Sequence, residues 1–113
     1  MITWDDFSKI DIRAGTITKA QPFEKAKKPA FQLEIDFGPL GIKKSSAQIT
    51  FHYTVEELIG RQVIAVVNFP PKQIANFFSE CLVLGVYDNQ NQVVLLHPSL
   101  KVDNGSKVGW TVF

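Results

Sequence analysis

The run T-V-E-E-L-I-G-R-Q-V-I-A-V-V occupies residues 54–67 and decides the fold class. Thr54 and Glu57 have the spacing of a capping box, in which the threonine caps a helix and the glutamate reaches back to the cap. Gly60 is placed to end this short helix. Residues 61–67 are apolar on both faces, which predicts a strand covered on both sides, or on one side by a partner chain.

Three strands are expected before this helix, after a helical turn at residues 4–10. Residues 13–20 are rich in Thr and Ile, and Gly15 within them suggests a bulge or a barrel bend. The run F-Q-L-E-I-D-F at residues 31–37 alternates apolar and polar side chains without a fault, which is typical of a half-buried strand. A Gly-Pro-Leu-Gly turn follows, and residues 42–48 predict a short polar strand.

After the helix, the apolar runs at residues 61–67, 80–87 and 93–96 predict buried strands, and residues 108–113 predict an edge strand. Five or six short strands, with one helix between the third and the fourth, are the arrangement of the OB-fold. We therefore expect an all-β protein: a five-stranded OB-fold Greek-key barrel with short helices. The length of 113 residues predicts one domain over residues 1–113.

The composition limits the classes of function. The net charge is only +1, so any nucleic-acid binding must use a local basic patch rather than bulk charge. A single cysteine excludes an internal disulfide framework and a multi-cysteine metal site. The acidic N-terminus lacks the pattern of a signal peptide, and no apolar run has membrane-spanning length. We expect a cytoplasmic protein without membrane insertion, metal or organic cofactor.

Signals for an enzyme are weak. Cys81 could form a nucleophile pair with His52 or His97, but no third orienting group stands out. A buried core cysteine is the more frequent explanation for a free cysteine in an apolar strand. The sequence therefore predicts that the protein is not an enzyme and has no catalytic residues.

The run V-V-N-F-P-P-K-Q-I-A-N-F-F-S-E-C-L at residues 66–82 connects two strands with far more residues than a plain hairpin needs. Its Pro70-Pro71 pair stiffens the backbone, which lowers the entropy lost on binding. Phe69, Phe77 and Phe78 flank Lys72, and aromatic side chains on a basic surface can stack bases, line a peptide pocket or contact a subunit. Phe69 directly follows a buried strand and is expected in the core, whereas one of the other two phenylalanines is expected to meet a partner.

Further lysines lie in two groups, Lys25, Lys27 and Lys28 in one loop and Lys43 and Lys44 in or near the third strand. In an OB-fold such loops and strands can line the face that holds phosphates. Lysines on a solvated surface, serving only solubility, remain the alternative.

The run at residues 66–85 resembles the signature of the tRNA-binding domain family, which includes modules appended to methionyl- and phenylalanyl-tRNA synthetases. Asn68, Phe69, Pro71, Lys72, Ser79 and Leu82 fill the family pattern. Residues 11–17 and 53–60 match as well. The runs F-G-P-L-G-I-K-K-S-S-A-Q-I-T and V-I-A-V-V-N-F-P-P-K are most similar to free-standing members of the family that serve as secretion chaperones.

The resemblance implies a homodimeric OB-fold that acts as an export-related chaperone, binding unfolded preproteins and the translocation ATPase SecA, with a capacity to bind tRNA. The alternative is a free-standing, structure-specific tRNA-binding protein. Carried over by position, Asn68 shapes the loop, Ser79 bonds a phosphate or peptide, and Lys72 supplies charge. The expected ligand-binding residues are Lys43, Lys44, Asn68, Lys72, Phe77, Phe78, Ser79 and Leu82.

Three departures from the synthetase pattern favour a less charged, more apolar ligand. Ala47-Gln48 stands where Ser-Gly is common, Gln73 replaces a basic residue, and Cys81-Leu82 replaces Gly-Met. The dimer expectation also has physical support, because a small barrel with apolar ends has surplus surface to bury. Those terminal apolar residues are Ile2, Trp4, Val108, Trp110 and Phe113.

Overall fold

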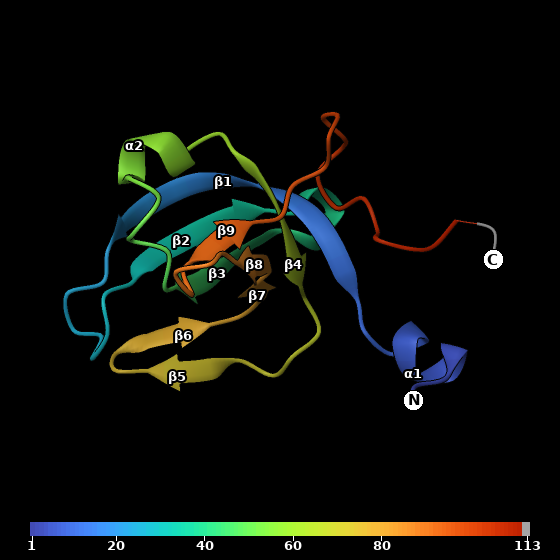
Figure 1. The fold of residues 1–113 in the computed structure, drawn as a ribbon. Helices are drawn as coiled ribbons and strands as arrows, with labels where there is room; N and C mark the ends of the chain where they lie inside the picture. The colour runs from blue at the N-terminus through green and yellow to red at the C-terminus, as the bar shows by residue number, and fades with distance from the viewer. Residues whose placement is uncertain (112–113) are drawn as a thin grey trace.

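A five-stranded antiparallel sheet, curled into a nearly closed barrel, forms the body of the computed structural model, which describes residues 1–111 (Figure 1). The strands are β1 (Ile12–Pro22), β2 (Phe31–Asp36), β3 (Ile42–Ala47), β4 (Gln62–Val66) and β7 (Leu82–Val83). Their order across the sheet is β3-β2-β1-β4-β7. With a short helix between β3 and β4, this is the OB-fold, and the predicted fold class is confirmed.

The predicted capping box forms at helix α2 (Val55–Leu58). The main-chain N–H of Glu57 donates to Thr54 Oγ1 at 3.3 Å, and the N–H of Thr54 donates to Glu57 Oε1 at 3.0 Å. Leu58 is fully buried in the core beneath this helix. Gly60 has a φ of 90°, a conformation that glycine adopts without strain, and its N–H donates to the carbonyl of Ile17 at 2.8 Å. The helix therefore covers one end of the barrel.

The alternation predicted for residues 31–37 is confirmed, because Phe31, Leu33, Ile35 and Phe37 are all buried. Gly15 on β1 lies against two of them. A Cβ at this position would sit 2.7 Å from atoms of both Ile35 and Phe37, so close packing requires glycine here. The irregularity in the β1–β2 pairing lies between Ile17 and Lys19 rather than at Gly15. Of the two alternatives for this glycine, the bulge is therefore wrong in position, and the barrel bend stays a prediction.

Side chains, rather than a main-chain ladder, close much of the barrel between β3 and residues 79–81. The N–H of Lys44 donates to Glu80 Oε1 at 2.9 Å, and the N–H of Glu80 donates to the carbonyl of Lys44 at 2.8 Å. The N–H of Ser46 donates to Ser79 Oγ at 3.2 Å. The hydroxyl of Ser45, fully buried, donates to the carbonyl of Cys81 at 3.0 Å. We call this contact the seam.

The long connection after β4 folds back on itself as a hairpin. Strands β5 (Lys72–Ile74) and β6 (Phe77–Ser79) pair antiparallel, and Ala75 at the turn has a φ of 53°. The expected burial of Phe69 is wrong, because this residue is 55% exposed. The chain leaves the barrel at residues 67–68, where the N–H of Val67 donates to the carbonyl of Asp11 at 2.8 Å, so Phe69 already lies beyond the core.

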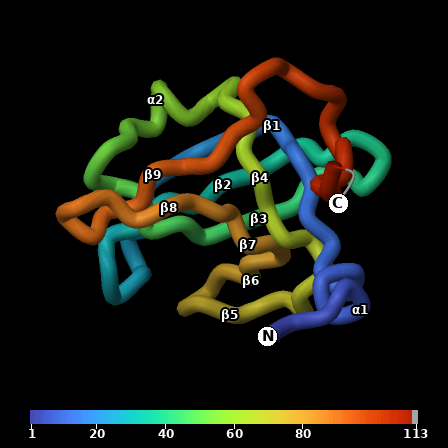
Figure 2. The backbone as a smooth tube through the Cα atoms, turned by 45° about the vertical axis from the view of Figure 1, so that its right-hand side comes forward, coloured from blue at the N-terminus to red at the C-terminus, as the bar shows by residue number. Residues whose placement is uncertain are grey.

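The strand expected over residues 80–87 is divided into β7 and β8 (Gly85–Tyr87) at Leu84, where the pairing partner changes. The N–H of Leu84 donates to the carbonyl of Ile64 on β4 at 2.8 Å. The carbonyl of Leu84 accepts from Leu96, which follows β9 (Val93–Leu95), at 3.2 Å. The described chain does not itself cover both faces of residues 80–87, since Leu82 is 48% and Tyr87 is 74% exposed, and cover by a partner chain stays a prediction. The strands β8 and β9 form a two-stranded hairpin (Figure 2), and Leu95 of β9 reaches the core.

The first and last described segments pack against each other beside the barrel. Helix α1 (Trp4–Ser8) precedes β1, and Trp110 packs against Trp4 and Phe7 with ring centroids 5.4 and 5.6 Å apart. The expected edge strand over residues 108–113 does not form within the described part, where Lys107 makes a single bridge to Arg13. Val112 and Phe113 lie outside the described residues.

The remaining element is the 3-10 helix η1 (Gly38–Leu40), which forms the predicted Gly-Pro-Leu-Gly turn. Among residues 1–111, none of the helices has the length and apolarity needed to cross a membrane.

Candidate functional site

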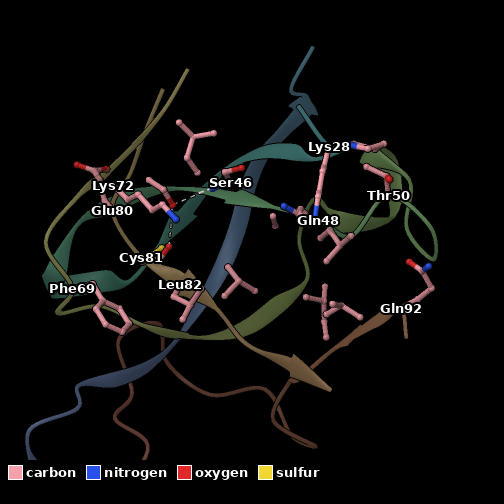
Figure 3. A pocket seen from close by; sticks show the side chains of 18 of the residues that line it. Lys28, Ser46, Gln48, Thr50, Phe69, Lys72, Glu80, Cys81, Leu82 and Gln92 are labelled. Atoms are coloured by element: carbon pink, nitrogen blue, oxygen red, sulfur yellow. Dashed lines mark hydrogen bonds between the residues drawn. The ribbon is translucent and has the colours of Figure 1, made fainter. Parts of the chain in front are cut away.

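An open groove of about 1380 Å³ runs beside the seam (Figure 3). The β5–β6 hairpin, the end of β3, strand β7 and the β8–β9 hairpin supply its walls. Its lining comes from residues 28–29, 46–51, 69–72, 79–83 and 91–93, with Ile74, Tyr87 and Leu95. Most of these side chains are apolar, and several are partly exposed to solvent. A groove of this size and character is typical of a ligand site.

Two lysines lie on this groove, and Figure 3 shows Lys72 and Lys28 on opposite sides of it. Glu80 is the single carboxylate in the lining, and its Oε1 accepts from the N–H of Lys44 at the seam. The groove thus has an excess of positive charge. The structure brings Lys72 and Lys28 together around one site, and it leaves Lys25 and Lys27 outside the lining.

Lys43 and Lys44 lie elsewhere. Lys44 is exposed and lines a smaller hollow of about 260 Å³ on the outer face of the sheet, together with Lys19 and Phe77. Lys43 is half-buried, and its charge acts on the thiol of Cys81, which places it near the seam. The basic residues expected to share one face are therefore divided between the groove and the outer sheet.

The aromatic residues are also divided. Phe69 lines the groove, contrary to its expected burial, and Leu82 lies with it as expected. Phe77 packs against Phe23 with ring centroids 5.4 Å apart. Phe78, on the opposite face of β6, is 54% exposed and lies outside the groove lining. Sequence reasoning missed Phe69 because its position after a buried strand suggested the core.

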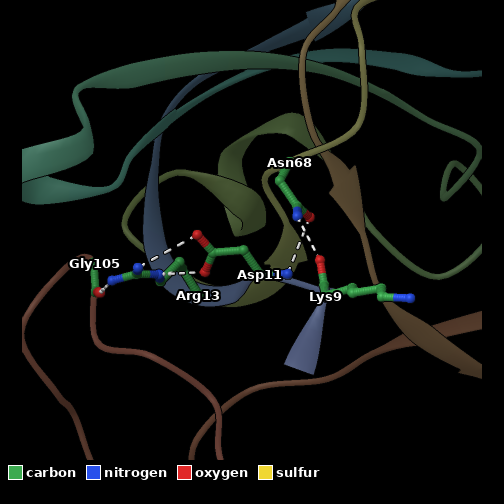
Figure 4. Close-up of polar contacts among 5 residues, drawn as sticks. All are labelled: Lys9, Asp11, Arg13, Asn68 and Gly105. Carbon is green, nitrogen blue, oxygen red and sulfur yellow. Dashed lines mark hydrogen bonds and ion pairs between the residues drawn. The ribbon is translucent and has the colours of Figure 1, made fainter. Parts of the chain in front are cut away.

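Two polar residues expected to bind ligand already have partners within the chain. Ser79 Oγ accepts from Ser46 and donates to the carbonyl of Cys81 at 3.3 Å. Asn68 Oδ1 accepts from the N–H of Asp11 at 3.0 Å, and Asn68 Nδ2 donates to the carbonyl of Lys9 at 2.7 Å (Figure 4). These bonds fix the point where the chain leaves β4. Asn68 thus ties the start of the loop to residues 9–11, and Ser79 sits at the seam beside the groove.

The segment joined to Asn68 is itself held in place by an ion pair. Arg13 Nε lies 2.6 Å from Asp11 Oδ1, and Arg13 Nη1 donates to the carbonyl of Gly105 at 3.0 Å (Figure 4). The hydrogen bond from Arg13 lowers the pKa of the Asp11 carboxyl, so this carboxylate stays charged at neutral pH. The base of the groove-forming loop is therefore rigidly attached to the start of β1.

Cys81 lines the groove but is buried, and burial raises the pKa of its thiol to about 11. At neutral pH the thiol is therefore protonated and a poor nucleophile. Its Sγ lies 3.7 Å from the carbonyl of Lys44, whereas His52 and His97 contact Asp88 and the carbonyl of Pro98. Neither histidine forms the nucleophile pair considered from the sequence.

A polar contact that the sequence did not predict joins the turn before α2 to the tip of the β8–β9 hairpin. His52 Nε2 lies 2.6 Å from Asp88 Oδ2. The other oxygen of Asp88 accepts from the main-chain N–H groups of Gln90 and Gln92. The bond from Gln92, and then that from His52, lower the pKa of the Asp88 carboxyl. His52 and Asp88 are 36 positions apart in the sequence, so no local sequence pattern could predict this pair.

A small OB barrel whose main hollow is an open, mostly apolar groove has the form of a ligand-binding module. The particular family is given by comparison with known sequences. Residues 12–107 match the model of the tRNA-binding domain family, and the chain belongs to this family.

Two solved chaperone structures are similar to this chain along nearly its whole length. The chaperone CsaA of Bacillus anthracis str. Ames is 53% identical with a TM-score of 0.92, and the match covers 96% of this chain and 99% of that chain. The CsaA chaperone protein of Picrophilus torridus is 55% identical with a TM-score of 0.91, covering 96% and 100%. The resemblance to the free-standing chaperones of the family is confirmed.

Among curated relatives, a methionine–tRNA ligase of Bacteroides fragilis is 36% identical over 107 residues. The aligned part is 95% of this chain but 16% of the ligase. The chain thus corresponds to a small part of such ligases.

Proposed function

We propose that the protein is a dimeric, export-related molecular chaperone that binds unfolded preproteins in the groove. The observation that carries this proposal is the open groove, in which apolar side chains such as Phe69 and Leu82 remain about half exposed. Exposed apolar surface of this extent marks an interaction site. The similarity to two proteins named as CsaA chaperones supports the same function.

The proposed peptide contacts come from residues around the groove. Phe69 and Leu82 supply apolar contact, Lys72 supplies charge, and Asn68 and Ser79 hold the walls in place. Binding of SecA is proposed from the resemblance to secretion chaperones. We propose a cytoplasmic location, because newly made preproteins and tRNA are both present there. Binding, rather than catalysis, is the proposed activity of the whole chain.

A capacity to bind tRNA is the second proposed function, and the family assignment favours it. The proposed surface is the outer face of the sheet, where Lys19 and Lys44 lie beside Phe77. Lys43 lies near the seam and Phe78 lies on the opposite face of β6 from Phe77, so both are outside this surface, which also holds the carboxylate of Glu34. Lysines can hold phosphates, and a partly exposed aromatic ring such as Phe77 can stack a base. Peptide and tRNA would then use different faces of the barrel.

The proposed homodimer rests on the apolar cluster at the chain ends. Trp4 and Trp110 are in contact, yet each keeps more than half of its surface exposed, and Ile2, two positions before Trp4 in the sequence, is exposed as well. Closed two-fold pairing is the commonest way for a small protein to bury such a patch.

Fluorescence anisotropy of a labelled, unfolded preprotein segment tests the chaperone proposal. The segment is titrated with the protein and then challenged with bulk tRNA at low and at moderate salt. We expect saturable binding that persists at moderate salt and resists tRNA, because apolar contacts release few counterions. Release of the segment by tRNA at low salt would show one shared surface. Absence of binding to the segment would leave tRNA binding as the remaining function.

A further inference from the structure

From Leu82 to Asp88, through β7, Leu84 and β8, the main chain is hydrogen-bonded along one side only. Its even-numbered residues face β4 and then β9. Leu84 bonds to Ile64 and to Leu96, and the N–H of Asp88 donates to the carbonyl of Gln92 at 2.9 Å. In an antiparallel pair, alternate residues point their main-chain groups to opposite sides. The registers Val66↔Leu82 and Val86↔Val94 agree with this parity.

The odd-numbered residues consequently face the other side, toward β3 and the groove. Cys81 is the first of these odd-numbered residues, and its carbonyl accepts hydrogen bonds from Ser45 and Ser79 at the seam. Beyond it, the main-chain N–H and C=O groups of Val83, Gly85 and Tyr87 have no partner among the described residues. Val83 and Tyr87 lie in the groove lining. The groove therefore has a free strand edge along one wall.

This edge is short, but it lacks the side-chain features with which proteins protect exposed strands. Charged side chains, prolines and bulges commonly prevent an edge from pairing with another chain. Residues 82–87 read L-V-L-G-V-Y, with neither charge nor proline. Gly85 fits the close approach of β9, since a Cβ there would lie 2.4 Å from Val93. An unprotected apolar edge beside a groove is suited to receive a strand.

The charges of the groove indicate what kind of polypeptide segment could pair with this edge. Lys28 and Lys72 lie on opposite sides of the groove, and the carboxylate of Glu80 is already bonded to Lys44. Charge complementarity therefore favours a segment that is apolar at alternate positions and carries acidic residues at its ends. A segment of about seven residues covers the row from Val83 to Tyr87, at roughly 3.3 Å per residue.

We propose that the groove binds its polypeptide ligand by strand addition: an extended segment with an apolar centre and acidic flanks pairs with the free main-chain groups of Val83, Gly85 and Tyr87. This inference rests on the proposed chaperone function and specifies how the client is held. Main-chain pairing explains how one groove accepts many sequences, because every polypeptide offers the same N–H and C=O groups.

Backbone methylation of a peptide tests the proposal. The parent peptide alternates valine and serine over about seven residues and has two glutamates at each end and a terminal fluorophore. The alternation fixes the register, because a slip by one residue would turn every valine away from the groove. Two derivatives carry N-methyl groups on the valines or on the serines. Anisotropy then gives the Kd of each peptide for the full chain.

In strand addition, one set of N–H groups faces the protein and the other faces water. We expect one derivative to bind at least about tenfold more weakly than the parent and the other to bind within about twofold, since two or three hydrogen bonds are lost in one case only. Equal Kd values for both derivatives, with the parent bound, would overturn strand addition and leave the chaperone function intact. Failure of the parent to bind would overturn both.

A pair of substitutions locates the added strand. Val86 on β8 and Val94 on β9 are directly opposite each other and both exposed, but only Val86 is on the strand with the free edge. Val86→Asp should weaken parent-peptide binding at least about fivefold, while Val94→Asp, the matched control, should change it less than twofold. Equal effects would contradict the proposed edge. If Val86→Asp lowered the light-scattering mass and left peptide binding unchanged, a second copy of the chain would be the occupant instead.

Discussion

The double variant Phe69→Ser, Leu82→Ser should lose most of its affinity for an unfolded preprotein segment and keep the fold. In the free protein, Phe69 is 55% and Leu82 is 48% exposed, so about half of each side chain remains for a ligand to cover. Full burial of such a side chain contributes about 1.5–3 kcal/mol, and half of that for two residues gives roughly 1.5–3 kcal/mol. The Kd should therefore rise by about tenfold to a hundredfold.

The assay is anisotropy of the labelled segment, with circular dichroism to verify that each variant is folded. Leu100→Ser is a matched control, because Leu100 is also an exposed apolar residue but lies outside the groove lining. Its Kd should equal that of the unmodified protein. Phe78→Ser tests whether the segment binds in the groove or on the other face of the β5–β6 hairpin. Phe78 is as exposed as Phe69 but lies outside the groove lining. If Phe78→Ser weakened binding and the double variant did not, the groove assignment would be refuted.

Three further predictions concern the thiol, the hairpin tip and the dimer. Because burial raises the pKa of Cys81 to about 11, the native protein should react slowly with iodoacetamide at pH 8 and quickly in urea; rapid native labelling would contradict this. Asp88 has a lowered pKa in the folded state, so its contribution to stability is present above the unfolded pKa of about 3.9 and is lost as the pH falls through the folded value. Asp88→Asn should have a lower Tm than the unmodified protein at pH 7, and the two Tm values should become equal below the folded-state pKa of Asp88. A difference in Tm that persists in acid would show another cause. Light scattering should give a mass near twice 12.7 kDa that Trp110→Ser reduces to the monomer value, whereas a single-chain mass for the unmodified protein would exclude the dimer.

Local patterns were sufficient for the body of the barrel. The alternation of residues 31–37 and the capping box at Thr54 each depend on neighbours in sequence, and both are present in the structure. A second capping box, at Thr3 and Asp6, was missed because aspartate takes the place of the usual glutamate. Such features follow from a few consecutive residues and need no knowledge of the tertiary structure.

The groove could not be predicted in the same way, because it depends on contacts between distant segments. The exposure of Phe69 is decided by bonds that release the chain from β4 at Val67 and Asn68, with partners at residues 9–11. The apolar run at residues 80–87 indicated a strand correctly but not its change of partner at Leu84. The distribution of the lysines depends on which strand face each one occupies. The sequence named candidate residues one by one, and only the fold showed which of them share a surface.

The side-chain closure of the barrel has a consequence for how this fold can diversify. Main-chain hydrogen bonds join neighbouring strands at four of the five strand-to-strand contacts of the barrel. Main-chain hydrogen bonds tolerate most changes of side chain. At the remaining contact, the gap between strands is spanned by Ser45, Ser79 and Glu80. Longer or shorter side chains at these three positions would widen or narrow the groove and leave the ladders unchanged. Related proteins could in this way come to bind ligands as different as a polypeptide and an RNA. The residues at the seam would change during evolution, and the hydrogen-bonded strands of the barrel would stay the same.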